Sequence, residues 1–300
     1  MKYAVSREFG VFRHFCAPIN HVIIKLAKGI LSVVPKRMKS TKSLSIAKQK
    51  ILCSDGKKIV IYIVKPKTYM GKLPVILFLH GGGFVYKGSP HHYALAKEYA
   101  SRSNSAVVYV DYRLAFDTPF GTTLSDCKTA YHYILNNHDE LNADRENICF
   151  GGDSAGGYLC LALAERCKTE GLTPPKKLLL VYPAVDPSMT TESMKRFSDT
   201  PMWNSRLNKK IWTIYSKGKD VFDPLRADLS YLPPTYIETA EYDCLHDEGI
   251  LLYQKLKASG VPCTLYETKG TMHGYDICSN APITRAAVEK RITFLKQTDN

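Results

Sequence analysis

The chain has 300 residues, of which 45% are hydrophobic and 23% are charged, a composition typical of a globular protein with a sizeable core. Its nine cysteines are scattered and include no C-x-x-C pair, which argues against a disulfide framework or a zinc site and favours a reducing compartment, with the cytoplasm as the default.

The net charge of +13 lies at one end, because residues 1–72 contain 16 Lys or Arg against two acids, Glu8 and Asp55. No nucleic-acid-binding motif accompanies this charge, so no nucleic-acid partner is predicted. A solvated lysine face and attraction to an anionic membrane or acidic polymer remain as the two interpretations.

Two amphipathic helices are predicted at the N-terminus. Phe9, Phe12 and Phe15 recur near helical spacing, and residues 19–34 form an apolar stretch that is interrupted by a histidine and two lysines. These interruptions argue against a transmembrane helix, and no uninterrupted apolar region with a cleavage site supports a signal peptide. We therefore predict no integral membrane segment, and we leave open a peripheral membrane contact through the basic N-terminal helices.

Strands and helices alternate along the rest of the chain. Residues 51–53 and 59–64 are predicted to form a hairpin, and residues 74–80 form an unbroken apolar run, which is typical of a strand buried on both faces in a parallel sheet. Further strands are predicted at 106–110, 147–150, 177–182, 236–239 and 263–267, and further helices at 90–103, 123–136, 250–258 and 283–296. This alternation predicts a single α/β domain. Residues 183–223 depart from it, contain both tryptophans, Trp203 and Trp212, and are predicted to form a cap element inserted between strands.

The motif Gly-Gly-Asp-Ser-Ala-Gly-Gly at 151–157 stands between a predicted strand and a predicted helix. This is the context that a G-x-S-x-G nucleophile motif requires, with glycines where strand and helix approach closely and Ser154 at the tip of a strained turn. A phosphate-binding loop would need a Lys-Ser/Thr pair or G-x-G-x-x-G spacing, and neither is present. Ser154 is therefore predicted to be a nucleophile.

A serine nucleophile needs a base, an orienting acid and an oxyanion hole. The sequence His-Gly-Gly-Gly-Phe at 80–84 follows an apolar strand, and its bare backbone N–H groups could face a developing oxyanion. Asp243 and then His273 follow Ser154, which is the order of the α/β-hydrolases. The predicted oxyanion donors are the backbone N–H groups of three residues: Gly82, Gly83 and Ala155.

With these motifs the chain resembles the hormone-sensitive-lipase-like serine esterases, also called bacterial type IV esterases. Six motifs in family order carry the resemblance, at residues 80–84, 111–115, 152–157, 232–234, 241–249 and 272–274. Two departures concern the pocket: Phe116-Asp117-Thr118-Pro119-Phe120-Gly121 replaces a usual proline and glutamate, and Tyr158 replaces a frequently small polar residue.

The resemblance implies a mostly parallel, eight-stranded α/β-hydrolase sheet in one domain over residues 1–300, with helices on both faces and cap elements at about 1–48 and 183–223. It selects Asp243 rather than Asp247 or Glu241 as the acid, and it gives His80 the role of bracing the oxyanion loop. Phe84 and Tyr158 are the predicted substrate contacts.

The predicted activity is hydrolysis of a small-molecule ester with a short, acetyl-like acyl group by a serine carboxylesterase, without a metal or organic cofactor. An amidase or peptidase on the same triad, and a catalytically silent ligand receptor, are the alternatives. The predicted oligomeric state is a monomer or a homodimer, since the resembling family often pairs through its final strand.

Overall fold

The structure, a computed structural model, describes residues 2–31 and 38–297. The end of the predicted apolar stretch 19–34 and the extreme termini of the predicted domain 1–300 lie outside the described residues. The strands are β1 (Leu44–Leu52), β2 (Lys58–Pro66), β3 (Leu73–Leu79), β4 (Ala106–Asp111), β5 (Ala143–Asp153), β6 (Lys177–Val181), β7 (Thr235–Tyr242) and β8 (Cys263–Met272). The helices are η1 (Arg7–Arg13), α1 (His21–Leu31), α2 (Pro90–Arg102), α3 (Thr122–Asn136), α4 (Ala155–Glu170), α5 (Glu192–Arg196), α6 (Ser205–Ser216), α7 (His246–Ala258), η3 (Tyr275–Ile277) and α8 (Pro282–Lys296).

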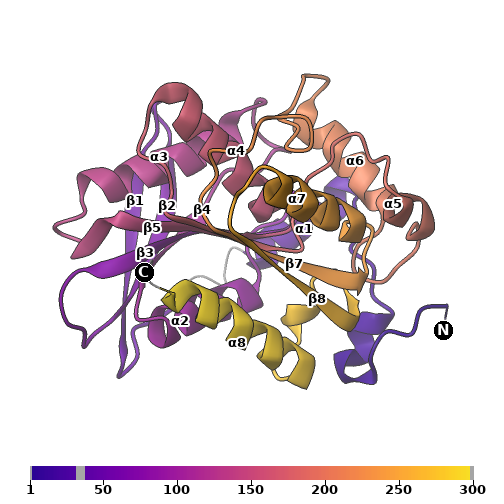
Figure 1. The fold of residues 1–300 in the computed structure, drawn as a ribbon, viewed down its shortest axis with the longest axis horizontal. Helices are drawn as coiled ribbons and strands as arrows, with labels where there is room; N and C mark the ends of the chain where they lie inside the picture. Colours follow the sequence, from indigo (N-terminus) through magenta and orange to yellow (C-terminus); the bar gives the residue numbers. More distant parts are fainter. Residues whose placement is uncertain (1, 32–37, 298–300) are drawn as a thin grey trace.

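The eight strands form one sheet in the order β1-β2-β4-β3-β5-β6-β7-β8. The pairs β1/β2 and β2/β4 are antiparallel, and every pair from β4 to β8 is parallel. Helices α3, α4 and α7 cover one face of the sheet, and α2 and α8 cover the other (Figure 1). The prediction of a mostly parallel eight-stranded sheet with helices on both faces is therefore confirmed.

Strand β3 shows why its sequence is apolar throughout. Leu77 and Leu79 belong to the core under α3 and α4, whereas Ile76 and Phe78 belong to the core under α2 and α8. Because successive side chains of a strand point to opposite faces, a strand covered on both sides needs an unbroken apolar run. The run also makes β3 a rigid support for the glycine loop that follows it.

Two chain segments outside the sheet meet above the carboxyl ends of the strands. Cys16 and Met202 form a parallel bridge, in which the Met202 N–H donates to Phe15 O at 2.6 Å and the Ala17 N–H donates to Met202 O at 3.1 Å. The predicted cap elements thus pack together, with two corrections. β1 begins at Leu44, so residues 44–48 belong to the sheet, and the first helical stretch is a short 3-10 segment that is interrupted at Gly10.

Candidate active site

Ser154 occupies a sharp turn between β5 and α4. Its backbone has φ 54° and ψ −120°, which is a strained conformation for a residue with a Cβ atom. Gly156 allows the backbone of the turn to pack closely against β3, because a Cβ atom at this position would lie 1.9 Å from Leu79 O. The Ser154 N–H donates to Val181 O at 2.9 Å, which ties the turn to the adjacent strand β6.

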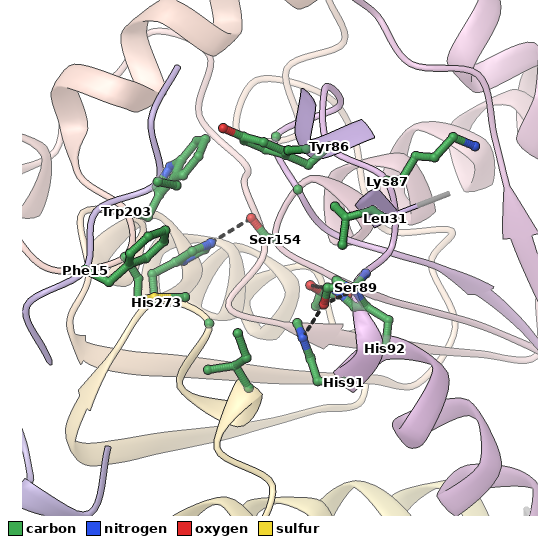
Figure 2. A pocket seen from close by; sticks show the side chains of 18 of the residues that line it. Phe15, Leu31, Tyr86, Lys87, Ser89, His91, His92, Ser154, Trp203 and His273 are labelled. Atoms are coloured by element: carbon green, nitrogen blue, oxygen red, sulfur yellow. Dashed lines mark hydrogen bonds and ion pairs between the residues drawn. The ribbon is translucent and has the colours of Figure 1, made fainter. Parts of the chain in front are cut away.

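The structure brings Ser154, His273 and Asp243 together from the ends of three parallel strands. His273 Nε2 lies 2.8 Å from Ser154 Oγ, and His273 Nδ1 lies 2.6 Å from Asp243 Oδ2. Figure 2 shows the serine hydroxyl pointing at the imidazole. Asp243 is fully buried, and its other oxygen accepts the Leu245 N–H at 3.0 Å. A carboxylate fixed in this way holds the proton on Nδ1 and leaves the Nε2 lone pair to accept the serine proton.

The two other acids near Asp243 have structural partners. The carboxylate of Asp247 accepts the Ser193 N–H at 2.7 Å, and Glu241 accepts the Gly270 N–H at 2.7 Å. These bonds brace loops, in agreement with the choice of Asp243 as the partner of the histidine.

The glycine loop after β3 faces the nucleophile. Gly82 and Gly83 line the same cavity as Ser154 and have φ values of 112° and 57°. In the described part of the chain their N–H groups donate to no backbone carbonyl. Ala155 is the first residue of α4, where an N–H group has no acceptor within its own helix. The three predicted donors are thus available to an anionic oxygen above Ser154.

His80 lies beneath this loop and is fully buried. Its ring stacks on Tyr112 with centroids 4.2 Å apart, and its Nδ1 lies 2.6 Å from Gly81 O. Burial, with a smaller contribution from the neighbouring His92, lowers the pKa of His80 to about 4. A neutral, stacked histidine suits the predicted role of loop brace.

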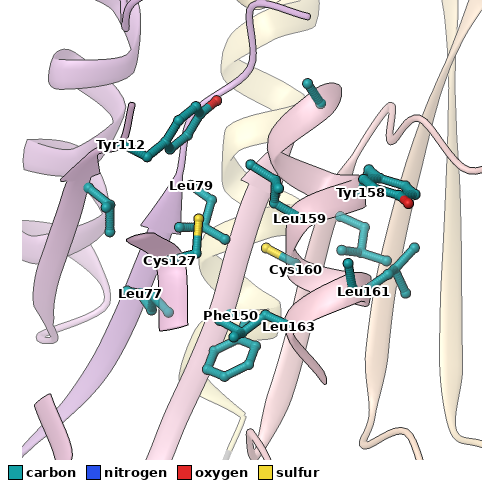
Figure 3. Close-up of a cluster of buried hydrophobic side chains, with 14 of the residues drawn as sticks. Leu77, Leu79, Tyr112, Cys127, Phe150, Tyr158, Leu159, Cys160, Leu161 and Leu163 are labelled. Carbon is teal, nitrogen blue, oxygen red and sulfur yellow. The ribbon is translucent and has the colours of Figure 1, made fainter. Parts of the chain in front are cut away.

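Phe84 and Tyr158 lie elsewhere than predicted. Both are 1% exposed, and among the described residues that line the cavity neither is found. The Phe84 ring stacks on Tyr215 of α6 at 4.0 Å, and the Tyr158 hydroxyl donates to Phe222 O at 2.8 Å. Figure 3 shows Tyr158 in the buried cluster around α4. These aromatic side chains attach the segment 183–223 to the sheet domain and do not form the wall that a substrate meets.

The cavity above the triad has a volume of about 520 Å³. Its wall is largely apolar and comes from both cap segments and from loops at the strand ends, with Phe15, Ala17, Pro18, Ile23, Ala27, Leu31, Tyr86, Tyr182, Met202, Trp203 and Ile277. Phe15 and Trp203 lie beside His273 (Figure 2). Of the three N-terminal phenylalanines, Phe15 lines the cavity. Phe9 is buried against Tyr275, and Phe12 is not among the described lining residues. Sequence reasoning missed Tyr182, although a residue at the carboxyl end of a strand beside the nucleophile is in the usual place for a ligand contact.

Tyr182 connects the base to a buried ionic network. Its ring packs edge-on against His273 with centroids 4.9 Å apart, and its hydroxyl donates to Asp276 Oδ1 at 2.5 Å. Arg291 donates to Asp276 at 2.9 Å and to Glu238 at 2.5 Å, and all three charged side chains are fully buried. Burial would raise the pKa of Asp276, but the charge of Arg291 outweighs it and holds the pKa below its ordinary value.

One group of described side chains has the spacing of metal ligands: His91, His92 and Asp153. The Ser89 N–H donates to His92 Nδ1 at 3.0 Å, so His92 Nε2 carries the proton and donates to Asp153 at 3.0 Å. A metal at this point would have to displace that proton and break the bond. In this structure His92 and Asp153 are engaged with each other.

The site has the arrangement of a serine hydrolase. It combines a serine at a strand-to-helix turn with a histidine–aspartate pair from later strands and with free N–H groups above them. A family model described as alpha/beta hydrolase fold matches residues 76–277. Carboxylesterase NlhH of Mycobacterium tuberculosis is 32% identical over 249 residues, which are 80% of this chain and 78% of the relative. An ethyl acetate hydrolase of Pseudomonas putida is 27% identical over 230 residues, covering 74% of this chain and 72% of the relative.

Among solved structures, a bacterial heroin esterase superposes with a TM-score of 0.87 and 29% identity, covering 98% of this chain and 97% of that one. The chain belongs to the hormone-sensitive-lipase-like, or bacterial type IV, esterase family of the α/β-hydrolases.

Proposed function

We propose that this protein hydrolyses carboxylic esters through an acyl-Ser154 intermediate, with His273 as general base and Asp243 as its orienting partner. The observation that carries the proposal is the single imidazole that lies 2.8 Å from the serine oxygen and 2.6 Å from the aspartate oxygen. Ester hydrolysis is also the activity that the names of the relatives state.

In the first half of the reaction, Ser154 Oγ attacks the ester carbonyl while His273 Nε2 takes the hydroxyl proton. The carbonyl oxygen becomes an oxyanion, and the N–H groups of Gly82, Gly83 and Ala155 stabilise it. The protonated histidine then gives its proton to the departing alcohol. In the second half, a water molecule loses its proton to His273 and attacks the acyl carbonyl. His273 then returns this proton to Ser154 Oγ as the bond between Oγ and the acyl carbon breaks and the acid product leaves.

We propose a small, acetyl-like acyl group. The name of the ethyl acetate hydrolase supports a short acyl chain, and the apolar cavity wall supports an uncharged ester. The cysteines are free thiols, which supports a reducing location such as the cytoplasm. For a homodimer, we propose that two copies pair through β8, which lies at the edge of the sheet. Light scattering measures whether the dimer forms.

The test is a series of nitrophenyl esters from two to about twelve acyl carbons, measured with the parent protein and with Ser154→Ala. We expect the highest kcat/KM at the short end, and we expect Ser154→Ala to lower it by about 10³-fold or more and to abolish labelling by a fluorophosphonate. Near-parent activity in Ser154→Ala would refute the nucleophile. A maximum at long chains would refute only the acyl preference, and faster cleavage of matched amides than of esters would favour an amidase.

A further inference from the structure

Exposed apolar side chains are concentrated in one short part of the described chain. Six of the ten large apolar residues that are exposed lie between residues 11 and 30: Val11, Phe15, Val22, Ile23, Leu26 and Ile30. Single exposed apolar residues are ordinary, but a contiguous group marks an interaction surface.

Helix α1 carries half of this group in a single row. Val22, Leu26 and Ile30 follow one another at intervals of four residues and are 63%, 65% and 72% exposed. Side chains at this spacing form one row along a helix. We call these three residues the outer row. Ile24, on the inward side, is only 4% exposed.

The same helix forms part of the cavity wall. Ile23, Ala27 and Leu31 line the cavity above Ser154, whereas no residue of the outer row does so within the described lining. α1 is therefore apolar both toward the cavity and toward solvent. A helix of 11 residues is about 16 Å long, which is too short to cross a bilayer, and no described helix is long and apolar enough to do so.

The stretch of sequence that contains α1 carries charge of one sign. Residues 9–54 contain nine Lys or Arg and no Asp or Glu. On α1 itself Lys25 is exposed, and Lys28 forms an ion pair with Asp117. An acidic soluble partner would satisfy the cations but not the apolar row, and a purely apolar partner would leave the cations unused. The headgroup region of an anionic lipid surface satisfies both.

We propose that α1 lies in the plane of an anionic lipid surface, with the outer row inserted among the acyl chains and the lysines at the phosphate level. In this orientation the cavity is separated from the lipid by one helix. Hydrophobic esters that dissolve in the lipid then have a short path to Ser154. Binding itself does not require catalysis, so the proposal stands or falls independently of the proposed ester hydrolysis.

The experiment is cosedimentation with phosphatidylcholine vesicles, with and without phosphatidylglycerol, using the full chain. We compare the parent with Leu26→Ser/Ile30→Ser and with a matched control, Leu52→Ser/Met70→Ser, whose residues are 64% and 93% exposed and lie outside the cap. We expect the parent to bind the anionic vesicles and the outer-row variant to bind them at least about tenfold more weakly. The control should bind like the parent, and added salt should weaken binding.

Hydrolysis of soluble nitrophenyl acetate shows that each variant is folded, since the substituted residues do not line the cavity. The proposal is overturned if the parent stays in the supernatant, if it binds neutral vesicles equally well, or if the outer-row variant binds like the parent. It is also overturned if light scattering shows a dimer that the outer-row substitutions convert to a monomer, because a second copy then covers this face.

Discussion

The carboxylate of Asp153 accepts a hydrogen bond from the N–H of Gly81 at 2.9 Å. This bond joins the end of β5, one residue before Ser154, to the start of the loop that carries two of the proposed oxyanion donors. The second oxygen of Asp153 accepts the proton of His92 Nε2 at 3.0 Å. Burial would raise the pKa of Asp153, but its interactions with His92, together with the hydrogen bond from the Gly81 N–H, outweigh burial and hold the pKa below the ordinary range. The carboxylate of Asp153 therefore holds the start of the loop with one oxygen and His92 with the other.

Replacing this carboxylate tests its effect on catalysis. An asparagine has one acceptor oxygen and cannot serve both donors, so we expect Asp153→Asn to lower kcat on nitrophenyl acetate by about 10- to 100-fold through a misplaced oxyanion loop, with little change in KM. Asp139→Asn is the control, because Asp139 is exposed, pairs with Lys72 and His138, and is absent from the described cavity lining. A parent-like kcat in Asp153→Asn would show that the loop keeps its position without the carboxylate.

Gly83 offers a second test of the oxyanion loop. A Cβ at this position would lie 2.8 Å from Cη2 of Trp203, and the φ of 57° costs an alanine about 1–2 kcal/mol. We expect Gly83→Ala to lower kcat by about 100-fold, because the loop must shift away from Ser154. Gly121→Ala is the matched control, since Gly121 has a φ of 83° but open space around its Cβ position. It should lose comparable stability in urea unfolding and keep its kcat; an equal loss of kcat in both variants would remove the role of the contact with Trp203.

The buried network around Arg291 gives a prediction about stability. Removing this guanidinium leaves Glu238 and Asp276 without their cation, so we expect Arg291→Met to lower the free energy of unfolding by about 3–5 kcal/mol. The urea midpoint at constant m-value measures it. Arg285→Met on the same helix removes an exposed guanidinium and should change the midpoint little. Similar midpoints for the two variants would contradict the prediction.

Stability should also fall as the pH is lowered from about 6.5 to about 4.5. Burial lowers the pKa of His80 and of His91 to about 4, so in this window the unfolded chain binds two protons that the folded chain does not. Glu248 has the opposite effect, because burial raises its pKa and the folded chain keeps one proton that the unfolded chain has lost. Because two histidines oppose one carboxyl group, the unfolded chain binds the larger number of protons over most of this window, and stability falls toward acid.

Urea midpoints across this pH range measure the slope. His91→Asn should make the slope shallower, because one of the two buried histidines is removed. Asp153 and Asp276 do not contribute in this window, since their lowered pKa values affect stability only below the ordinary value of 3.8. A profile that is flat or that rises toward acid would contradict the assignment of neutral, buried histidines.

Ser154 was predicted from its local motif and Asp243 from the family resemblance, whereas the cavity wall was not predicted. The glycines around Ser154 mark the turn in the sequence, so a seven-residue motif predicts it. The destination of Phe84 depends on Tyr215 of α6, which no local pattern reveals. The start of β1 was also missed, because residues 45–50 are mostly polar and become a strand through their pairing with β2 at the sheet edge.

The bridge between Cys16 and Met202 joins the two segments of the proposed cap, and residues of both segments line the cavity. Ser154, Asp243 and His273 instead stand at strand ends. Much of the wall can therefore change without altering the strand ends, although Trp203 also lies close to His273 and Gly83. In a protein with this architecture, substitutions in the two segments can change which esters are accepted while the residues at the strand ends stay the same. For an engineer, a library confined to Phe15, Ile23, Leu31 and Trp203 is the corresponding route to new selectivity.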